Sequence, residues 1–275
     1  MNIALAAPPT GQLGNRIFHY NLLWQLSAKA KIHCTHFRFK DSIFFENLDT
    51  KLSLSNLFYK KFFINSDELI NFKDDWINFL IKNNNKRICI KLVPPLLGDT
   101  YINFTFYSPQ NFLKIKSKYK ITPSWRTQYK NAIGIHFRGG DFHQWDSSAI
   151  FPFKYYDDSL KYILEKTYIH KNTALILFTD DNRLPSYEAV QKKYSWLPIF
   201  LGNTRALPIH DFYAMSLCNT LISTPSTFSI WSGIIGKNTK IIHNKEWAYK
   251  HADNSLFWSR IVDNTVPYYN IEALI

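Results

Sequence analysis

Strand-like and helix-like segments alternate through the second half of the chain, and this alternation limits the fold more than any other feature. Apolar runs of strand length are separated by segments with apolar residues at helical spacing, and the connections are short. We expect strands over residues 131–138, 173–179, 197–201, 219–224 and 239–243, and helices over 153–166, 186–194, 210–217 and a last segment that ends at Gly236. This alternation is typical of parallel strands joined by helical crossovers. It predicts an α/β fold with a doubly wound parallel sheet.

The first half of the chain opens with a similar unit. The expected elements are strands over residues 2–7, 31–36 and 88–93 and helices over 17–30 and 64–79. The whole chain is therefore predicted to hold two Rossmann-like domains that face a cleft. A polar stretch that contains Pro123 is the best candidate for a boundary, which divides the chain into domains over 1–125 and 126–275.

The chain is basic, with a net charge of +12, and this favours an anionic ligand or an anionic membrane surface. A generic basic surface is the plainer explanation, because most lysines are scattered. Nucleic acid is not an expected partner, because no motif interleaves basic and aromatic residues and an acidic pair lies in the candidate site.

The cysteines and the amino terminus bear on the compartment. Cys34, Cys89 and Cys218 have apolar neighbours and form no C-x-x-C pair, so we expect free thiols in a reducing compartment. The segment Met1–Pro8 lacks a basic region and is predicted to be a strand, not a signal peptide. No run approaches the roughly eighteen apolar residues of a spanning helix. These features predict a cytoplasmic protein with peripheral contact to the inner face of a membrane.

One strand of the second half runs directly into polar residues. Ala132-Ile-Gly-Ile leads into His136, Arg138, two glycines and Asp141. Ligands of open α/β sheets bind beyond the carboxyl ends of the strands, and the planar guanidinium of arginine suits phosphate oxygens. The segment therefore predicts a phosphate contact at Arg138, with a solvated arginine in a turn as the alternative.

Two further turns are expected at the same edge of the sheet. One holds Asp180 and Asp181, which can accept hydrogen bonds from a base or a ribose, or can cap the next helix. The other holds Ser226 and Thr227, which are either a simple helix cap or an anion site at a helix amino terminus. Together with Arg138 these turns predict a nucleotide site, with the diphosphate on Arg138 and the helix terminus.

Metal ligands are not expected at this site. The sequence contains no D-x-D spacing, and no ligand-like spacing links the isolated histidines. Arg138 and backbone amides would then neutralise the diphosphate, which predicts a metal-independent reaction without a cofactor. The segment Gly11-Gln-Leu-Gly14-Asn15 is neither G-x-G-x-x-G nor a P-loop. Between a strand and a helix, it can bring backbone amides close to a phosphate.

Four segments in this order resemble motifs of the GDP-fucose-dependent fucosyltransferases, most of all the bacterial α-1,2-fucosyltransferases of glycosyltransferase family 11. They are Gly11–Tyr20 (similar to G-x-x-G-N-x-x-F-x-Y), His136–Asp141 (H-x-R-R-G-D), Phe178–Asp181 (an acidic pair at a strand end), and Asp211–Cys218 with Ser226–Gly233 (ending S-T-F-S-W-W-G). Two positions depart from the family pattern. Gly139 stands where the family has a second arginine, and Ile230 replaces a tryptophan.

The resemblance implies a GT-B-like architecture, with acceptor contacts in the first domain and GDP-fucose bound mainly by the second. It implies that Arg138 binds the diphosphate beside His136, and that Asp180, with Asp181, addresses the guanine. The remaining donor contacts implied are Ser226, Thr227 and Phe228 along the diphosphate, and Gly14 and Asn15 from the other domain.

The reaction implied is an inverting transfer of fucose to a hydroxyl of an oligosaccharide or glycolipid, such as an α-1,2 linkage to galactose. Asp146 is the first candidate for the base, because it follows Arg138 by the spacing of an acid in the α-1,6 relatives. Asp141 is the second candidate, with bracing of the Arg138 turn as its alternative role. The Gly139 departure leaves two other hypotheses open, a transferase of another nucleotide sugar and a non-catalytic carbohydrate-binding homologue.

Overall fold

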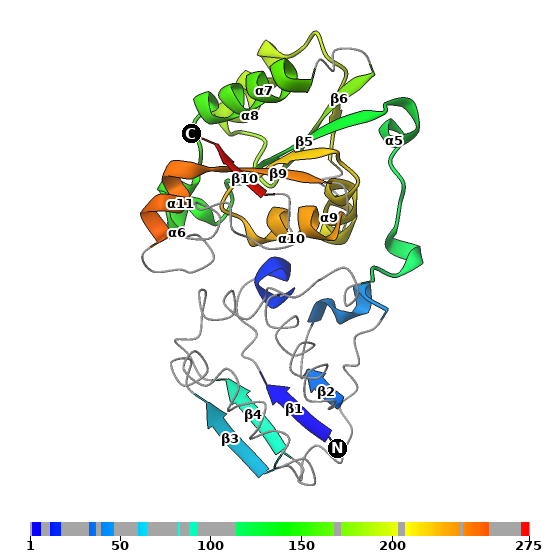
Figure 1. Ribbon diagram of the computed structural model, residues 1–275, viewed down its shortest axis with the longest axis vertical. Helices are drawn as coiled ribbons and strands as arrows, with labels where there is room; N and C mark the ends of the chain where they lie inside the picture. The colour runs from blue at the N-terminus through cyan, green and yellow to red at the C-terminus, as the bar shows by residue number, and fades with distance from the viewer. Residues whose placement is uncertain are drawn as a thin grey trace. The chain divides into compact units, whose positions relative to one another are not determined.

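The computed structural model describes residues 2–6, 12–17, 33–36, 40–46, 60–64, 82, 88–92, 114–167, 172–202, 207–236, 239–252 and 271–274. The chain divides into two compact units, Met1–Lys114 with Asn254–Phe257, and Ile115–Asp253 with Trp258–Ile275. Each unit contains a parallel sheet (Figure 1). The helix expected over 17–30, apart from Ile17, and the helix expected over 64–79, apart from Ile64, lie outside the described residues.

The first unit holds a four-stranded parallel sheet with the strand order β2-β1-β4-β3. Its strands are β1 (Asn2–Ala6), β2 (His33–His36), β3 (Lys60–Ile64) and β4 (Ile88–Leu92). The strands predicted over 2–7, 31–36 and 88–93 are confirmed. Strand β3 was not predicted, and Ile64, the expected start of a helix, is its last residue. The 3-10 helix η1 (Lys40–Phe44) also belongs to this unit.

The second unit holds a six-stranded parallel sheet with the order β10-β9-β8-β5-β6-β7. Its strands are β5 (Asn131–Phe137), β6 (Thr173–Thr179), β7 (Ile199–Leu201), β8 (Thr220–Ile222), β9 (Lys240–Asn244) and β10 (Ile271–Leu274). The chain builds outward from β5 to β7, and then outward in the other direction from β8 to β10. The predicted doubly wound sheet is confirmed, and its topological switch point lies between β5 and β8.

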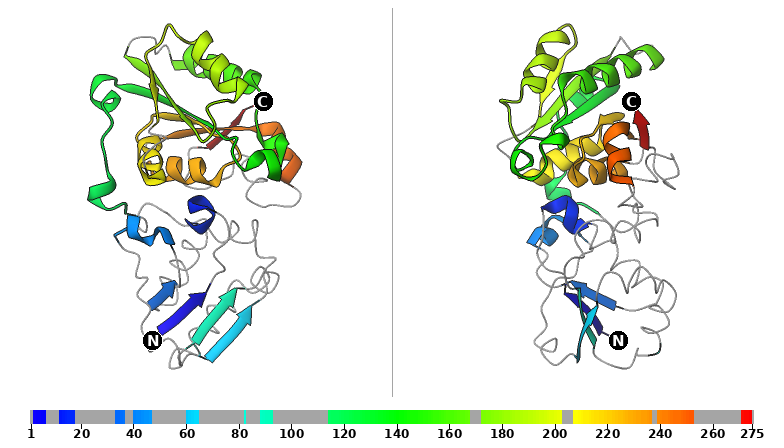
Figure 2. Two further views of the ribbon diagram at one scale, coloured as in Figure 1. Left: turned by 180° about the vertical axis from the view of Figure 1, so that it is seen from behind. Right: turned by 90° about the vertical axis from the view of Figure 1, so that its left-hand side faces the viewer.

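Helices cover both faces of this sheet (Figures 1 and 2). Helices α7 (Phe153–Thr167) and α8 (Pro185–Lys193) lie on one face, and α9 (Pro208–Ser216) and α10 (Thr227–Ile235) lie on the other. The Phe137 ring packs against Tyr156 of α7 and Tyr187 of α8. On the opposite face Ile176 shares a buried cluster with Met215 of α9. Coverage on both faces explains why β5 and β6 are almost continuously apolar.

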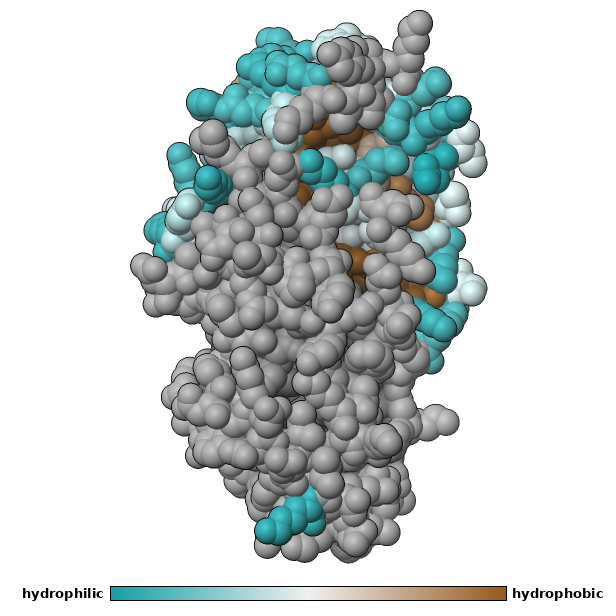
Figure 3. Space-filling model, in the orientation of Figure 1, coloured by the Kyte–Doolittle hydropathy of each residue, from teal (hydrophilic) through white to brown (hydrophobic). Residues whose placement is uncertain are grey.

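Shorter elements complete the second unit. They are η4 (Ser117–Tyr119), α5 (Trp125–Gln128), α6 (Phe142–Trp145), η5 (Ser147–Ala149) and α11 (Lys245–Ala252). The face of this unit visible in Figure 3 is mainly hydrophilic where the described residues can be seen. Within the described ranges, no helix has the length and apolar character needed to cross a membrane.

Candidate functional site

The candidate site lies at the carboxyl ends of β5 and β8, at the switch point of the second sheet. Ile135 of β5 pairs with Ile222 of β8, so the polar residues that follow each strand emerge at the same edge. The two strand ends are linked directly, because His136 Nδ1 lies 3.2 Å from the Thr224 hydroxyl. Both side chains are buried. This edge is where open α/β sheets bind their ligands.

Arg138 follows β5 and is clamped by two carboxylates. Its Nη1 lies 2.5 Å from Asp180 Oδ2, and its Nη2 lies 2.5 Å from Asp141 Oδ1. The guanidinium also lies 5.1 Å from the centroid of the Phe142 ring. The side chain is only 13% exposed, and its Nε is buried without a partner among the described residues. These contacts fix the orientation of the guanidinium.

The two glycines after Arg138 let the loop pack directly on the end of β6. Gly140 has a φ of +29°, and a Cβ there would lie 2.5 Å from Asp180 Oδ2. The Gly139 amide donates to Asp180 Oδ1 over 2.9 Å. A Cβ on Gly139 would lie 3.0 Å from both Asp181 Cβ and Leu184 Cδ2. The loop thus has almost no room for a side chain where the resembled motif has an arginine.

The acidic pair after β6 is engaged within the protein. Asp180 binds Arg138 and the Gly139 amide through its two carboxylate oxygens. Asp181 Oδ1 accepts hydrogen bonds from the Arg183 amide and from Arg183 Nε, and these bonds lower the pKa of Asp181. Contacts of this pair with a base or ribose stay a prediction. The ion pair between Asp180 and Arg138 links the end of β6 to the end of β5.

The turn between β8 and α10 supplies a helix amino terminus at the same edge. Ser226 is the N-cap residue in extended conformation, and α10 begins at Thr227. The turn is held by buried hydroxyls, since Ser223 Oγ and Ser229 Oγ lie 2.8 Å apart and Ser229 Oγ donates to the Ser226 carbonyl. The Phe228 ring packs near His136, with centroids 6.1 Å apart. Backbone amides at such a terminus favour an anionic ligand.

His136 is neutral in the folded protein near physiological pH. Burial, with a further contribution from the charge of Arg138, lowers its pKa to about 3. The ring is therefore a weak base, and its evident role is to hold the ends of β5 and β8 together through Thr224. His243, at the end of β9, is also buried, and burial lowers its pKa to about 4.

We expect these two histidines to make the fold sensitive to mild acid. Their folded-state pKa values lie below the unfolded value of 6.5, so the unfolded chain binds more protons as the pH falls. The free energy of unfolding should fall below about pH 6.5, by about 1.4 kcal/mol per pH unit for each histidine down to about pH 4. Urea unfolding between about pH 7.5 and about pH 5 measures this.

His136→Gln should remove about half of that slope, because one of the two titrations is lost. His143→Gln is the matched control, since the His143 side chain is 55% exposed. A stability that does not change over this pH range would contradict the assignment of both buried histidines.

The two candidate bases lie in the segment after Arg138. Asp141 is 55% exposed and contacts Arg138 just before α6 begins. Asp146 follows α6 and caps η5, where its Oδ1 accepts hydrogen bonds from the Ser148 amide over 2.9 Å and from the Ser148 hydroxyl over 2.6 Å. The geometry gives Asp141 the bracing contact with Arg138 and places Asp146 farther along the same segment.

Gly14 and Asn15 belong to the first unit. The sequence placed them in a turn before a helix that starts at Ile17, and this is corrected, because residues 13–17 are already helical. Gly14 is buried and Asn15 is exposed. The adjacent Arg16 forms an ion pair with Asp41, with 2.6 Å between Nη1 and Oδ2.

One carboxylate at the sheet edge received no role from the sequence. Asp211 lies in the first turn of α9, and its Oδ1 would be 3.1 Å from a Cβ on Gly202, just after β7. Asp211 therefore lies at the carboxyl edge of the sheet, the same edge as the site residues that follow β5, β6 and β8. The available signal was an acidic residue in the first turn of a helix that follows a predicted strand.

The described residues at this edge supply charge through side chains and backbone groups. In the part of the chain that is described, no group of three or more His, Cys, Asp or Glu side chains is arranged to hold a metal ion. The cationic group that follows β5 is Arg138, and the amino terminus of α10 adds backbone donors. Cys218 is a buried free thiol, whose pKa is raised by burial.

Comparison with known proteins identifies a family and several similar folds. The model of glycosyl transferase family 11 matches residues 113–257, which include every element of the site in the second unit. Among solved structures, a mutant of FUT1 from Arabidopsis thaliana in complex with GDP is similar, with a TM-score of 0.57, 13% identity, and coverage of 86% of this chain and 69% of that chain. POFUT1 in complex with GDP-fucose has a TM-score of 0.53 and 10% identity, with coverage of 86% and 93%. Among curated proteins, no sequence matches significantly.

Proposed function

This chain belongs to glycosyltransferase family 11, and from that premise we propose that it transfers fucose from GDP-fucose to a hydroxyl of a glycan acceptor. One observation carries the proposal. Arg138 follows β5 at the switch point and is held in a fixed orientation. The amino terminus of α10 follows β8, the strand that pairs with β5. The complexes of FUT1 with GDP and of POFUT1 with GDP-fucose support a GDP-sugar as the donor.

In this proposal the diphosphate lies between Arg138 and the turn that holds Ser226, Thr227 and Phe228. The Arg138 guanidinium and the amides at the start of α10 are donors that suit phosphate oxygens. Asp180 and Asp181 recognise the guanine edge. Because Asp180 also holds Arg138, recognition of the base is coupled to the position of the diphosphate contact. Gly14 and Asn15 add donor contacts from the first unit.

The reaction is a single displacement. The acceptor hydroxyl oxygen forms a bond to C1 of fucose as the bond between C1 and the β-phosphate oxygen breaks, so the anomeric centre inverts. The hydroxyl proton passes to Asp146, and GDP leaves with its new charge on the β-phosphate. Arg138 and the α10 terminus stabilise that charge, which is why the mechanism requires no metal ion.

The acceptor proposed is an oligosaccharide or glycolipid, with α-1,2 transfer to galactose as the leading linkage. A glycolipid is presented at a membrane surface. The net charge of +12 supports peripheral contact with anionic lipids on the cytoplasmic side.

A donor comparison tests the proposal. We expect GDP release from GDP-fucose to be stimulated by a galactose-ended acceptor such as lactose, with much slower release from GDP-mannose and none of UDP from UDP-galactose. Calorimetry with GDP measures binding independently of turnover. Preference for another nucleotide sugar would reassign the donor, and failure to bind any GDP-sugar would favour a non-catalytic carbohydrate-binding homologue.

The same assay in excess EDTA tests the metal-independent mechanism. Turnover should persist, because the proposed cations are protein groups. Complete loss of activity that manganese restores would contradict this part of the mechanism.

A further inference from the structure

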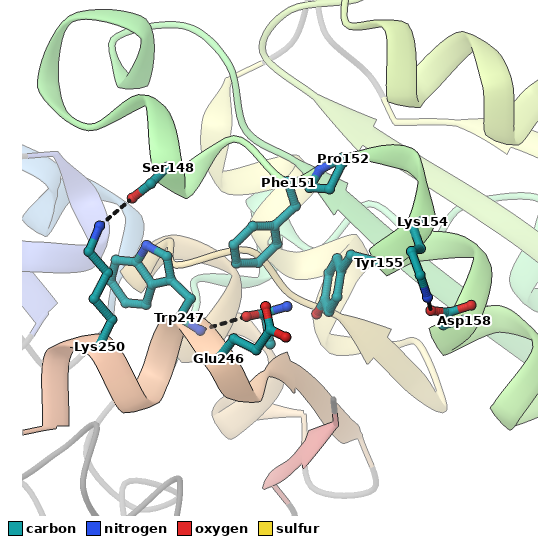
Figure 4. Close-up of a pocket in the computed structure, with 10 residues that line it drawn as sticks. Ser148, Phe151, Pro152, Lys154, Tyr155, Asp158, Glu246, Trp247 and Lys250 are labelled. Atoms are coloured by element: carbon teal, nitrogen blue, oxygen red, sulfur yellow. Dashed lines mark hydrogen bonds and ion pairs between the residues drawn. The ribbon is translucent and has the colours of Figure 1, made fainter.

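A pocket of about 330 Å³ lies in the second unit, next to the segment that carries Asp146 (Figure 4). Its walls come from η5, the connection from η5 to α7, the first turns of α7, the end of β9 and the first turns of α11. None of the donor contacts proposed above lines it. Its volume is near the lower end of the range for ligand sites, roughly 300–1,000 Å³. A single ring-sized group fits such a space, and a nucleotide sugar does not.

One side of the pocket is aromatic and held rigidly. Phe151, Tyr155 and Trp247 line it, and the rings of Phe151 and Tyr155 have centroids 4.6 Å apart. The Tyr155 hydroxyl donates to the Ser223 carbonyl over 2.8 Å, and the Trp247 amide donates to Asn244 Oδ1 over 2.7 Å. These bonds fix the walls before a ligand arrives, which reduces the entropy lost on binding.

The polar side of the pocket carries both signs of charge. Lys154 pairs with Asp158, with 2.5 Å between Nζ and Oδ2, and Lys250 Nζ donates to the Ser148 hydroxyl over 3.3 Å. In Figure 4 the three rings lie between these two contacts. The fourth charged group is Glu246, whose side chain is exposed. Two lysines and two carboxylates balance, so the pocket offers no net attraction to a phosphate.

The polar side is connected to the candidate base. Ser148 donates to Asp146 through both its amide and its hydroxyl, and the same hydroxyl accepts from Lys250. A ligand that contacts Ser148 is therefore one side chain away from Asp146, and a ligand that contacts Lys250 is two side chains away.

We propose that this pocket binds a neutral pyranose unit of the glycan acceptor. The apolar C–H face of the ring packs on the aromatic wall, and its hydroxyls bond to Glu246, Lys250 and Asn244. The pocket accepts one ring, so the rest of the glycan extends out of it. That the sugar belongs to the acceptor rests on the proposed function, whereas binding of a neutral pyranose does not.

The direct test uses saturation-transfer NMR on the whole chain with saturating GDP, so that the donor site is filled. The probes are the methyl pyranosides of galactose, glucose, mannose and fucose. We expect at least one of them to bind, and Glu246→Gln to weaken its affinity about tenfold, because a charged acceptor is replaced by a neutral one. Glu188→Gln, the same change at an exposed position of α8, is the matched control and should leave the affinity unchanged.

In turnover assays, Glu246→Gln should raise the acceptor KM by a similar factor, with the effect confined to the acceptor. Three results would overturn the pocket assignment. They are no pyranoside binding to a wild type that binds GDP, equal affinities in wild type and Glu246→Gln, and displacement of the sugar by inorganic phosphate. A wild type that binds pyranosides but no GDP-sugar would instead overturn the proposed function.

Discussion

Replacing Arg138 by alanine should lower turnover of GDP-fucose by about a thousandfold or more, the usual effect of removing a preorganised donor from developing transition-state charge. Arg138 is the cationic side chain at the switch point that the carboxylates of Asp141 and Asp180 hold in place. Its guanidinium is already held in one orientation by Asp141, Asp180 and the Phe142 ring. Initial rates and calorimetric GDP affinity measure the effect, and both should fall.

Arg138→Lys separates charge from shape. Lysine keeps the positive charge but loses the planar arrangement of donors that reaches both Asp141 and Asp180, so we expect most of the activity to be lost as well. Arg126→Ala, at an exposed position of α5, is the matched control and should have wild-type rates. Thermal unfolding checks that the alanine variant still folds, because it leaves two carboxylates without their cation. A folded Arg138→Ala protein with near-normal rates would refute the diphosphate assignment.

The fold of the second unit was predictable because its central strands are covered on both faces. Strand β6 is buried at every position, and its apolar run matches the predicted bounds 173–179. Two strands at sheet edges, one in each unit, were not predicted. Strand β10 is four residues long and β3 begins with two lysines, so neither has an apolar run of sufficient length. Helix α11 follows β9 without a loop, and its start was marked only by Asn244, whose Oδ1 accepts a hydrogen bond from the Trp247 amide.

The three turns of the site were predictable from strand ends, but their mutual contacts were not. The pairing of Phe137 with Thr179 sets the next residues, Arg138 and Asp180, side by side. Strand register of this kind is a property of the folded sheet and is not visible in either segment alone.

The structure also supplies a physical reason for the departure at Gly139. The β5 loop lies so close to Asp181 and Leu184 that a Cβ at this position would already be tight against both. A larger residue therefore requires the loop after β5 to move away from the start of α8. In this chain the glycine at position 139 thus goes with a loop that packs against Asp181 and Leu184, and Arg138 is held by Asp141 and Asp180.

Asp146→Asn should reduce kcat by about a hundredfold or more and leave the affinity for GDP unchanged. The amide cannot accept the acceptor proton, and general base catalysis is typically worth about 10²–10⁴ in rate. The fold should survive, because asparagine caps a helix as well as aspartate does and its oxygen can still accept from the Ser148 amide. Initial rates with saturating donor and acceptor measure kcat, and calorimetry measures the GDP affinity.

Two further variants decide whether the loss belongs to the proton transfer. Glu188→Gln repeats the carboxylate-to-amide change on the exposed side of α8 and should retain wild-type kcat. Asp141→Asn weakens the brace on Arg138, so its loss should include weaker GDP binding, unlike the loss at Asp146. An Asp146→Asn protein with unchanged kcat would remove Asp146 as the base. If Asp141→Asn instead lowers kcat and leaves the GDP affinity unchanged, Asp141 is the base. Loss of its contact with Arg138 would weaken GDP binding, whereas loss of the base would not.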